Sequence, residues 1–186
     1  MRLYIGLIHY PVYNKNHEII ASAITPMDLH DIARSAKTYD VKKFFVVTPL
    51  DDQQGLAEQV RRHWTKGYGA RYNRHRKEAI ELLSVVSSLK GAVEEIVEIE
   101  GMRPLLIATD ASEQRDRMIS YASARALLLE NRVVILLFGT AWGLEKAVLK
   151  EADHILAPIL GKRGYNHLSV RTAAAIILDR LVGDFE

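Results

Sequence analysis

Apolar residues in this chain gather into short continuous runs that end at turn or charged residues. The run Val133–Phe138 is typical, because it is β-branched at its start, ends at Gly139 and is too short for a buried helix. Such runs indicate strands that are buried on both faces, as in a parallel sheet. We expect strands at Arg2–His9, Lys43–Thr48, Ser84–Ser88, Pro104–Thr109, Val133–Phe138 and His154–Ala157, with a short edge strand at Ala70–Tyr72.

Between these runs, apolar residues recur at helical spacing. In Pro26–Tyr39, for example, Leu29 and Ile32 fall on one face, and Thr25 is the expected N-cap. The same spacing predicts further helices at Gln53–Trp64, Lys77–Leu83, Lys90–Glu100, Ser120–Leu129 and His167–Leu181. Residues 18–23 fit either a short helix or an extended segment.

Strands and helices alternate along the whole chain, without a repeat or a low-complexity linker. This alternation predicts an α/β protein with a mainly parallel sheet and helices on both faces. No change of composition marks a boundary, so we expect residues 1–186 to form a single domain.

Composition excludes several classes of protein. With 186 residues, 48% of them hydrophobic, the chain can bury a sizeable core. No apolar run approaches the roughly 18–20 residues of a transmembrane helix, and the N-terminus is typical of a strand rather than a signal peptide. The absence of cysteine excludes disulfides and suits a reducing cytoplasm, where we expect the protein to act.

Two glycine-containing loops follow consecutive strands near the C-terminus, Gly139–Gly143 and Ile159–Asn166. A polar segment, Thr109–Ser112, follows an earlier strand in the same way. The carboxyl ends of parallel strands are where α/β proteins bind ligands, and glycine lets a ligand approach the backbone. We therefore expect a ligand pocket among the three loops; ordinary strand-to-helix turns are the alternative.

Other familiar signatures of chemistry are missing. The sequence has no Gly-x-Gly-x-x-Gly after its first strand, no P-loop and no serine nucleophile elbow. Its histidines show no paired metal-ligand spacing, so we expect no metal.

The segment Leu136–Leu144 is a hydrophobic strand followed by a glycine turn. Further on, Ala157–Gly161 is followed by His167–Arg171, which opens an alanine-rich helix. In these two segments the chain resembles the middle motif and the last motif of the SPOUT superfamily of RNA methyltransferases. One large branch carries a glutamate in the middle motif, where Ala141 and Trp142 stand in this chain.

This resemblance implies a C-terminal deep trefoil knot, bound S-adenosylmethionine and a homodimer. Periodicity alone cannot predict a knot, which is rare among protein topologies. The residues that the resemblance places at the cofactor are Thr109, Leu137, Phe138, Gly139, Gly143, Ile159, Gly161, Tyr165, Asn166, Leu168 and Val170.

Methyl transfer from a sulfonium requires the protein to align the acceptor and to remove its proton where it carries one. The resemblance extends to the helix that begins at Pro26, where Arg34 stands at the position of a functional arginine and Asp28 at that of an asparagine. Arg34, Asp28 and Asp110 are therefore the candidate catalytic residues. The sequence does not choose a general base among them, and a solvated or salt-bridged surface residue is the alternative for Arg34.

The segment 61–77 contains no acidic residue, and aromatic residues alternate with its cations. Cations bind phosphates and aromatic rings stack on unpaired bases, so this composition is typical of an RNA-binding surface. A solvated basic face is the alternative. The candidate RNA-binding residues are Arg61, Arg62, Lys66, Arg71, Arg74 and Arg76.

These features predict an S-adenosylmethionine-dependent RNA methyltransferase that acts on tRNA or rRNA, with no membrane attachment. The alternative is a non-catalytic RNA-binding or nucleotide-binding module on the same fold. The replaced glutamate and asparagine positions keep this alternative open.

Overall fold

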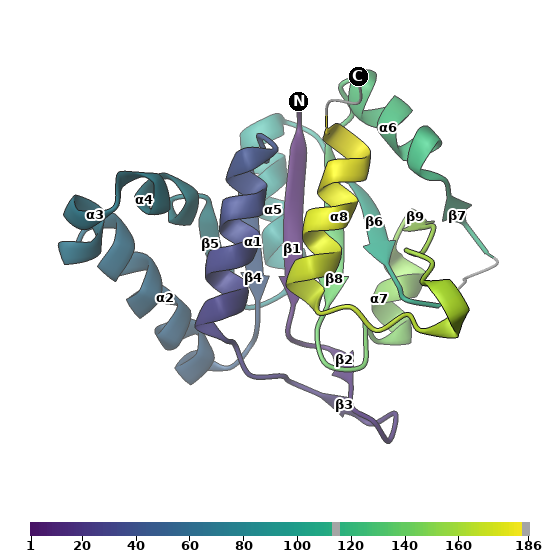
Figure 1. Cartoon of the computed structure of the whole chain (residues 1–186), viewed down its shortest axis with the longest axis horizontal. Coiled ribbons are helices and arrows are strands. Elements are labelled where there is room, and N and C mark those ends of the chain that lie inside the picture. The colour runs from purple at the N-terminus through teal and green to yellow at the C-terminus, as the bar shows by residue number, and fades with distance from the viewer. Residues whose placement is uncertain (113–115, 184–186) are drawn as a thin grey trace.

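The computed structural model describes residues 1–112 and 116–183. At its centre is a seven-stranded sheet in the order β5-β4-β1-β8-β6-β9-β7, in which all pairings are parallel (Figure 1). The strands of this sheet are β1 (Leu3–Ile8), β4 (Lys43–Val47), β5 (Leu83–Val86), β6 (Leu105–Thr109), β7 (Met118–Ile119), β8 (Val134–Gly139) and β9 (His154–Leu156). The predicted α/β fold with a parallel sheet is confirmed.

Helices cover both faces of this sheet. In Figure 1, α1 and α8 lie side by side across one face, and α5 lies behind the sheet. The helices are α1 (Pro26–Thr38), α2 (Asp51–Thr65), α3 (Tyr68–Tyr72), α4 (Arg74–Ile80), α5 (Leu89–Glu100), α6 (Tyr121–Leu129), α7 (Lys146–Glu151) and α8 (Val170–Val182). A separate antiparallel pair, β2 (Val12–Tyr13) and β3 (Ile19–Ile20), follows β1.

The alternation of side chains along β1 explains why the strands are apolar throughout. Leu3, Ile5 and Leu7 belong to the core on the side of α1 and α8, whereas Tyr4 and Ile8 belong to the core on the side of α5. All five are fully buried. A strand that is covered on both faces has no solvent-facing positions, so its sequence reads as a continuous apolar run.

The edge strand predicted at residues 70–72 is wrong, because these residues end the helix α3. In this short helix Gly69 is buried against α2, where an added Cβ would lie 2.7 Å from a ring carbon of Trp64. The close packing of one helical turn on α2 decides the conformation, and local sequence does not reveal it.

Two other small elements also differ from expectation. The seventh strand of the sheet is β7, whose two residues are too few to produce a periodic pattern. The helix predicted at Lys77–Leu83 lies earlier, at Arg74–Ile80, because the Asn73 side chain caps it by accepting from the Arg76 N–H at 2.9 Å. Residues 18–23 form no helix and contain β3.

The C-terminal segment returns across the sheet to the first helix. After β9 the chain runs through residues 157–169, and α8 then packs against α1 (Figure 1). The first and last helices of the chain are therefore neighbours. The knot itself stays a prediction from the resemblance.

Candidate functional site

A cleft of about 920 Å³ opens at the carboxyl ends of the central strands, on the face that carries α1 and α8. From β1 the chain runs outward through β4 and β5, and it later fills the other side of the sheet with β8, β6 and β9. The segments that leave β1 and β8 stay hydrogen-bonded to each other, because Val12 forms a bridge with Leu144 and the Trp142 N–H donates to the carbonyl oxygen of Tyr13. The cleft lies beside them, at the carboxyl ends of the strands, where open α/β sheets bind ligands.

The three loops predicted to bind a ligand meet in this cleft. Residues 109–112, 139–143 and parts of 157–171 line it. Asn166 joins two of the loops, because its Nδ2 donates to the carbonyl oxygen of Ala111 at 2.6 Å. Two of the three loops are thus tied together in the cleft, although they lie far apart in the sequence.

Most of the predicted cofactor residues line the cleft, and three do not. Leu137 faces away, because neighbouring residues of β8 point to opposite sides of the sheet and Leu137 belongs to the α5 core. Gly161 and Tyr165 are also outside the lining, and Tyr165 is 69% exposed. The predicted residues that line it are Thr109, Phe138, Gly139, Gly143, Ile159, Asn166, Leu168 and Val170.

Gly139 and Gly161 are required by the loops themselves. A Cβ at Gly139 would lie 2.7 Å from the backbone nitrogen of Leu144, and a Cβ at Gly161 would lie 1.7 Å from the carbonyl oxygen of Tyr165. Both separations are too short for non-bonded atoms, so a side chain at either position would force the loop open. Glycine therefore shapes the cleft through the loop backbone, before any ligand approaches.

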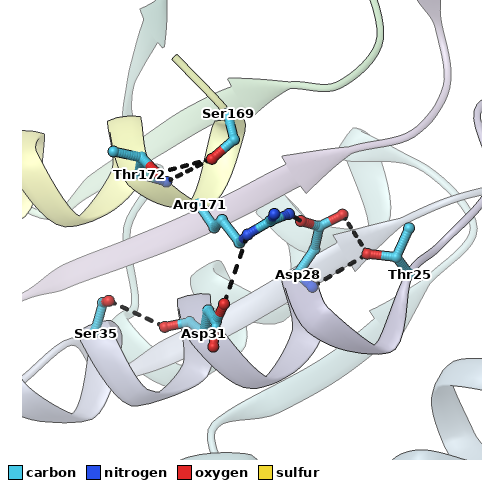
Figure 2. A network of polar contacts seen from close by, with 7 residues as sticks. All are labelled: Thr25, Asp28, Asp31, Ser35, Ser169, Arg171 and Thr172. Atoms are coloured by element: carbon cyan, nitrogen blue, oxygen red, sulfur yellow. Dashed lines mark hydrogen bonds and ion pairs between the residues drawn. The ribbon is translucent and has the colours of Figure 1, made fainter.

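Asp28 is at the centre of the polar wall of the cleft (Figure 2). It is 8% exposed; its Oδ1 accepts from Arg171 Nη1 at 2.9 Å, and its Oδ2 accepts from Thr25 Oγ1 at 2.7 Å. The Thr25 hydroxyl in turn accepts from the Asp28 N–H at 3.2 Å, as the predicted N-cap of α1. Each carboxylate oxygen keeps lone-pair capacity for a ligand donor.

Arg171 is the residue of this wall that the sequence analysis missed. It lies in the first turn of α8, where the helix dipole disfavours a cation. Its Nη1 contacts Asp28, and its Nε lies 3.6 Å from Oδ2 of Asp31, so it bridges two carboxylates of α1 (Figure 2). A cation at the start of a predicted helix is the signal that could have marked it.

The three candidate catalytic residues do not lie together. Asp28 and Asp110 line the cleft, whereas Arg34 lines a neighbouring groove of about 510 Å³ between α1 and α8. Asp110 is held in its loop, because its Oδ1 accepts from the N–H and the hydroxyl of Ser112, both at 2.7 Å. Arg34 is exposed on the outer side of α1, away from the cleft of its own chain.

A buried hydrogen-bonded chain lies at the end of β1. The Nδ1 of His9 is 2.9 Å from Ser22 Oγ, which is 2.5 Å from Thr140 Oγ1, and Thr140 donates to the carbonyl oxygen of Ile8 at 3.0 Å. A carbonyl only accepts, so we infer that Ser22 donates to Thr140 and that the Nδ1–H of His9 donates to Ser22. Burial lowers the pKa of His9 to about 4, so the ring is neutral near pH 7.

The candidate RNA-binding residues lie on α2, α3 and α4 and, in the case of Lys66, directly after α2, at the other end of the sheet from β7 and β9 (Figure 1). Arg61 is paired with Glu58 and Arg74 with Glu78. Arg76 is packed over the ring of Trp64, with 4.8 Å from its guanidinium carbon to the ring centroid. In the described part of the chain, the exposed cations of this group without an ion pair are Arg62, Lys66 and Arg71.

Two exposed tyrosines are close to these cations in the sequence. The rings of Tyr68 and Tyr72 on α3 are stacked, with centroids 6.0 Å apart and an angle of 22° between the planes. Each residue is 74% exposed. We call Arg62, Lys66, Arg71, Tyr68 and Tyr72 the basic-aromatic surface.

Within residues 1–112 and 116–183, no three histidine, aspartate or glutamate side chains come together as a metal site. No helix in the same residues has the length and apolar character needed to cross a membrane.

The fold and the cleft together define a class of protein. A parallel sheet whose C-terminal strands end in cleft-lining loops, with the last helix packed on the first, is the architecture expected of SPOUT-like methyltransferases. The chain matches the model of the SAM-dependent RNA methyltransferase family over residues 2–183, and it belongs to that family.

Individual relatives agree with this assignment. A tRNA (guanine-N(1)-)-methyltransferase of Nitratidesulfovibrio vulgaris is 46% identical over 182 residues, which are 98% of this chain and 42% of the relative. A protein of Aquifex aeolicus is 38% identical over 180 residues, covering 96% of this chain and 87% of the relative. The chain thus spans less than half the length of the curated methyltransferase it matches, whose named activity is that of a longer protein.

Solved structures confirm the fold. The TrmH/SpoU tRNA modifying enzyme of A. aeolicus superposes with a TM-score of 0.56 at 14% identity, covering 97% of this chain and 73% of the other. With the family match, this likeness confirms the resemblance to the SPOUT superfamily.

We predict that burial of His9 makes the protein less stable as the pH falls from 6.5 to about 4. The unfolded chain binds a proton at His9 near pH 6.5 and the native state only near pH 4, so protonation favours unfolding between these values. His9→Asn keeps an N–H donor for Ser22 but does not titrate. The melting temperature of this variant should therefore fall less steeply between pH 6.5 and about 4 than that of the wild type. Parallel curves of melting temperature against pH for the two proteins would contradict the prediction.

Proposed function

We propose that this chain binds S-adenosylmethionine in the cleft and transfers its methyl group to RNA. The observation that carries the proposal is the meeting of three strand-exit loops with the Asp28–Arg171 pair around one cleft of about 920 Å³. The chain also belongs to a family described as SAM-dependent RNA methyltransferases.

The residues of the cleft fit such a cofactor. Ile159, Leu168 and Val170 give one part of the lining an apolar character that suits an adenine ring, and the loop backbones supply polar groups. Ligand pockets have volumes of about 300–1,000 Å³, and this cleft lies near the upper end of that range. It therefore has room for a nucleobase beside the cofactor.

The bound cofactor supplies a methyl group on a sulfonium sulfur. The protein must hold the acceptor atom in line with the methyl–sulfur bond and take up its proton where it carries one. Asp28 is suited to the second task, because it faces the cleft while Thr25 and Arg171 fix the orientation of its carboxylate. Asp110 lines the same cleft and is the second candidate.

The basic-aromatic surface is the proposed contact for RNA outside the cleft. Its unpaired cations would neutralise phosphates, and its stacked tyrosines offer ring faces to unpaired bases. We favour tRNA over rRNA, because the N. vulgaris relative is named as a tRNA methyltransferase. The cytoplasm, where these RNAs are modified, is the proposed location.

A homodimer is part of the proposal. The groove between α1 and α8 exposes Arg34 next to the small side chain of Ala175, so a second copy could approach closely there. Arg34 would then reach the cleft of the partner, although it lies outside the cleft of its own chain. The knotted path of the C-terminal segment is likewise proposed from the superfamily.

A non-catalytic module on the same fold is the alternative function. It is supported by the middle motif, where Ala141 and Trp142 replace the glutamate of one large SPOUT branch. Such a module would bind RNA or S-adenosylmethionine without transferring a methyl group.

We predict that the purified protein transfers labelled methyl groups from S-adenosylmethionine to unmodified tRNA transcripts. Asp28→Asn preserves the size of the side chain but removes the proton acceptor, so turnover should fall by about 100-fold or more. Calorimetry should find little change in cofactor affinity. Asp31→Asn, one turn along α1 and outside the cleft lining, is the matched control and should lose much less activity.

The same assay tests the role of Arg34. Arg34→Lys keeps the charge but loses the planar fork, so turnover should fall by about tenfold or more. Mixing Arg34→Lys protein with Asp28→Asn protein should restore activity, because each mixed dimer contains one complete site. If the mixture does not recover activity, Arg34 does not act in the cleft of the partner. A wild-type protein that binds RNA but transfers no methyl group would establish the non-catalytic module as the function.

We predict that replacing Arg62, Lys66 and Arg71 together by alanine weakens RNA binding and flattens its salt dependence. The slope of log affinity against log salt should fall by about one unit for each lost phosphate contact. The control is Arg61→Ala with Arg74→Ala, whose guanidinium groups are already paired with carboxylates. An equal change of slope in both variants would contradict the assignment of this surface.

A further inference from the structure

Trp142 is an exposed tryptophan in the wall of the cleft. It is 64% exposed and lies in the loop 139–143 after β8. Exposing so large an apolar side chain to water is unfavourable, and tryptophan is enriched where proteins bind partners. The chain has one other tryptophan, Trp64, and that ring is covered by Arg76. The exposure of Trp142 therefore points to a ligand.

The backbone around Trp142 is held in place, although its indole is uncovered. The Trp142 N–H donates to the carbonyl oxygen of Tyr13 at 2.9 Å, and the Tyr13 N–H donates to that of Gly143 at 3.0 Å. The loop also makes a tight turn, with φ of 51° at Ala141 and 101° at Gly143. A ring that is presented by a fixed backbone can bind a flat ligand without the cost of ordering a loop.

These hydrogen bonds place Trp142 on the β1 side of the cleft. Tyr13 belongs to β2, and the same stretch of chain leads on to Thr25 and Asp28 in the polar wall. Ile159, which suits the adenine of the cofactor, comes from the loop after β9, and β9 is separated from β1 in the sheet by β8 and β6. The indole therefore borders the part of the cleft that the cofactor leaves to the acceptor.

We propose that Trp142 is the platform on which the acceptor nucleobase stacks before methyl transfer, an inference that rests on the proposed function. Enzymes that modify a base hold it outside its helical stack, against aromatic or apolar side chains. Every base has a ring face, so the indole supplies affinity and orientation for any of them. Asp28 would then accept a hydrogen bond from an N–H on the edge of the stacked base.

The test compares wild type, Trp142→Ala, Trp142→Phe and Leu129→Ala with pooled unmodified tRNA transcripts as the RNA. Leu129 is the matched control, because it is 82% exposed at the end of α6 and does not line the cleft. Trp142→Ala should lower kcat/KM for RNA by about tenfold or more, since base stacking on the ring is lost. Trp142→Phe should keep most of the activity, and Leu129→Ala should keep all of it.

Two further readouts separate stacking from other roles of Trp142. Cofactor affinity by calorimetry and the melting temperature should stay at wild-type values in all variants, because the substitutions change exposed side chains and leave the backbone of the loop 139–143 as it is. With S-adenosylhomocysteine bound, the transcripts should quench tryptophan fluorescence more strongly in the wild type than in Trp142→Phe.

Equal kcat/KM for wild type and Trp142→Ala would overturn the inference and leave the proposed function standing. A loss of cofactor affinity that matches the loss of activity would also overturn it, by assigning the indole to the cofactor. A wild type that methylates no transcript would remove the proposed function and this inference together.

Discussion

The parallel direction of all seven strands is the constraint on which the site depends. It brings every carboxyl end to one edge of the sheet, so loops from distant parts of the sequence open at the same place. The order of the strands then decides where along that edge a cleft can form. Because β8, β6 and β9 are neighbours in the sheet, the loops that follow these three strands lie together and line the cleft.

The Asp28–Arg171 pair joins the two ends of the chain across this cleft. Asp28 near the start of α1 interacts favourably with its own helix dipole, whereas Arg171 in the first turn of α8 does not and depends on Asp28 and Asp31. The polar wall is therefore complete only when the C-terminal helix has docked on the first one. Because Asp28 is nearly buried, the pair fixes the carboxylate at the cleft more than it stabilises the fold.

The sequence predicted the fold class, the main strands and the three loops, because continuous apolar runs and glycine turns are local signals. It could not predict what depends on packing. The helix α3 forms because Gly69 lies against Trp64, and Leu137 faces the α5 core because of the strand register. Arg34 lies outside the cleft, in the groove between α1 and α8, because α8 packs on α1. No local sequence pattern predicts this packing.

The central claim is that S-adenosylmethionine binds among residues 109–112, 139–143 and 157–170. Hydrogen–deuterium exchange with and without saturating S-adenosylmethionine tests it most directly, because exchange reports protection segment by segment. We expect slower exchange in these three loops and unchanged exchange in α2, α3 and α4. Protection confined to α2–α4, or none in the three loops at a concentration where calorimetry detects binding, would contradict it.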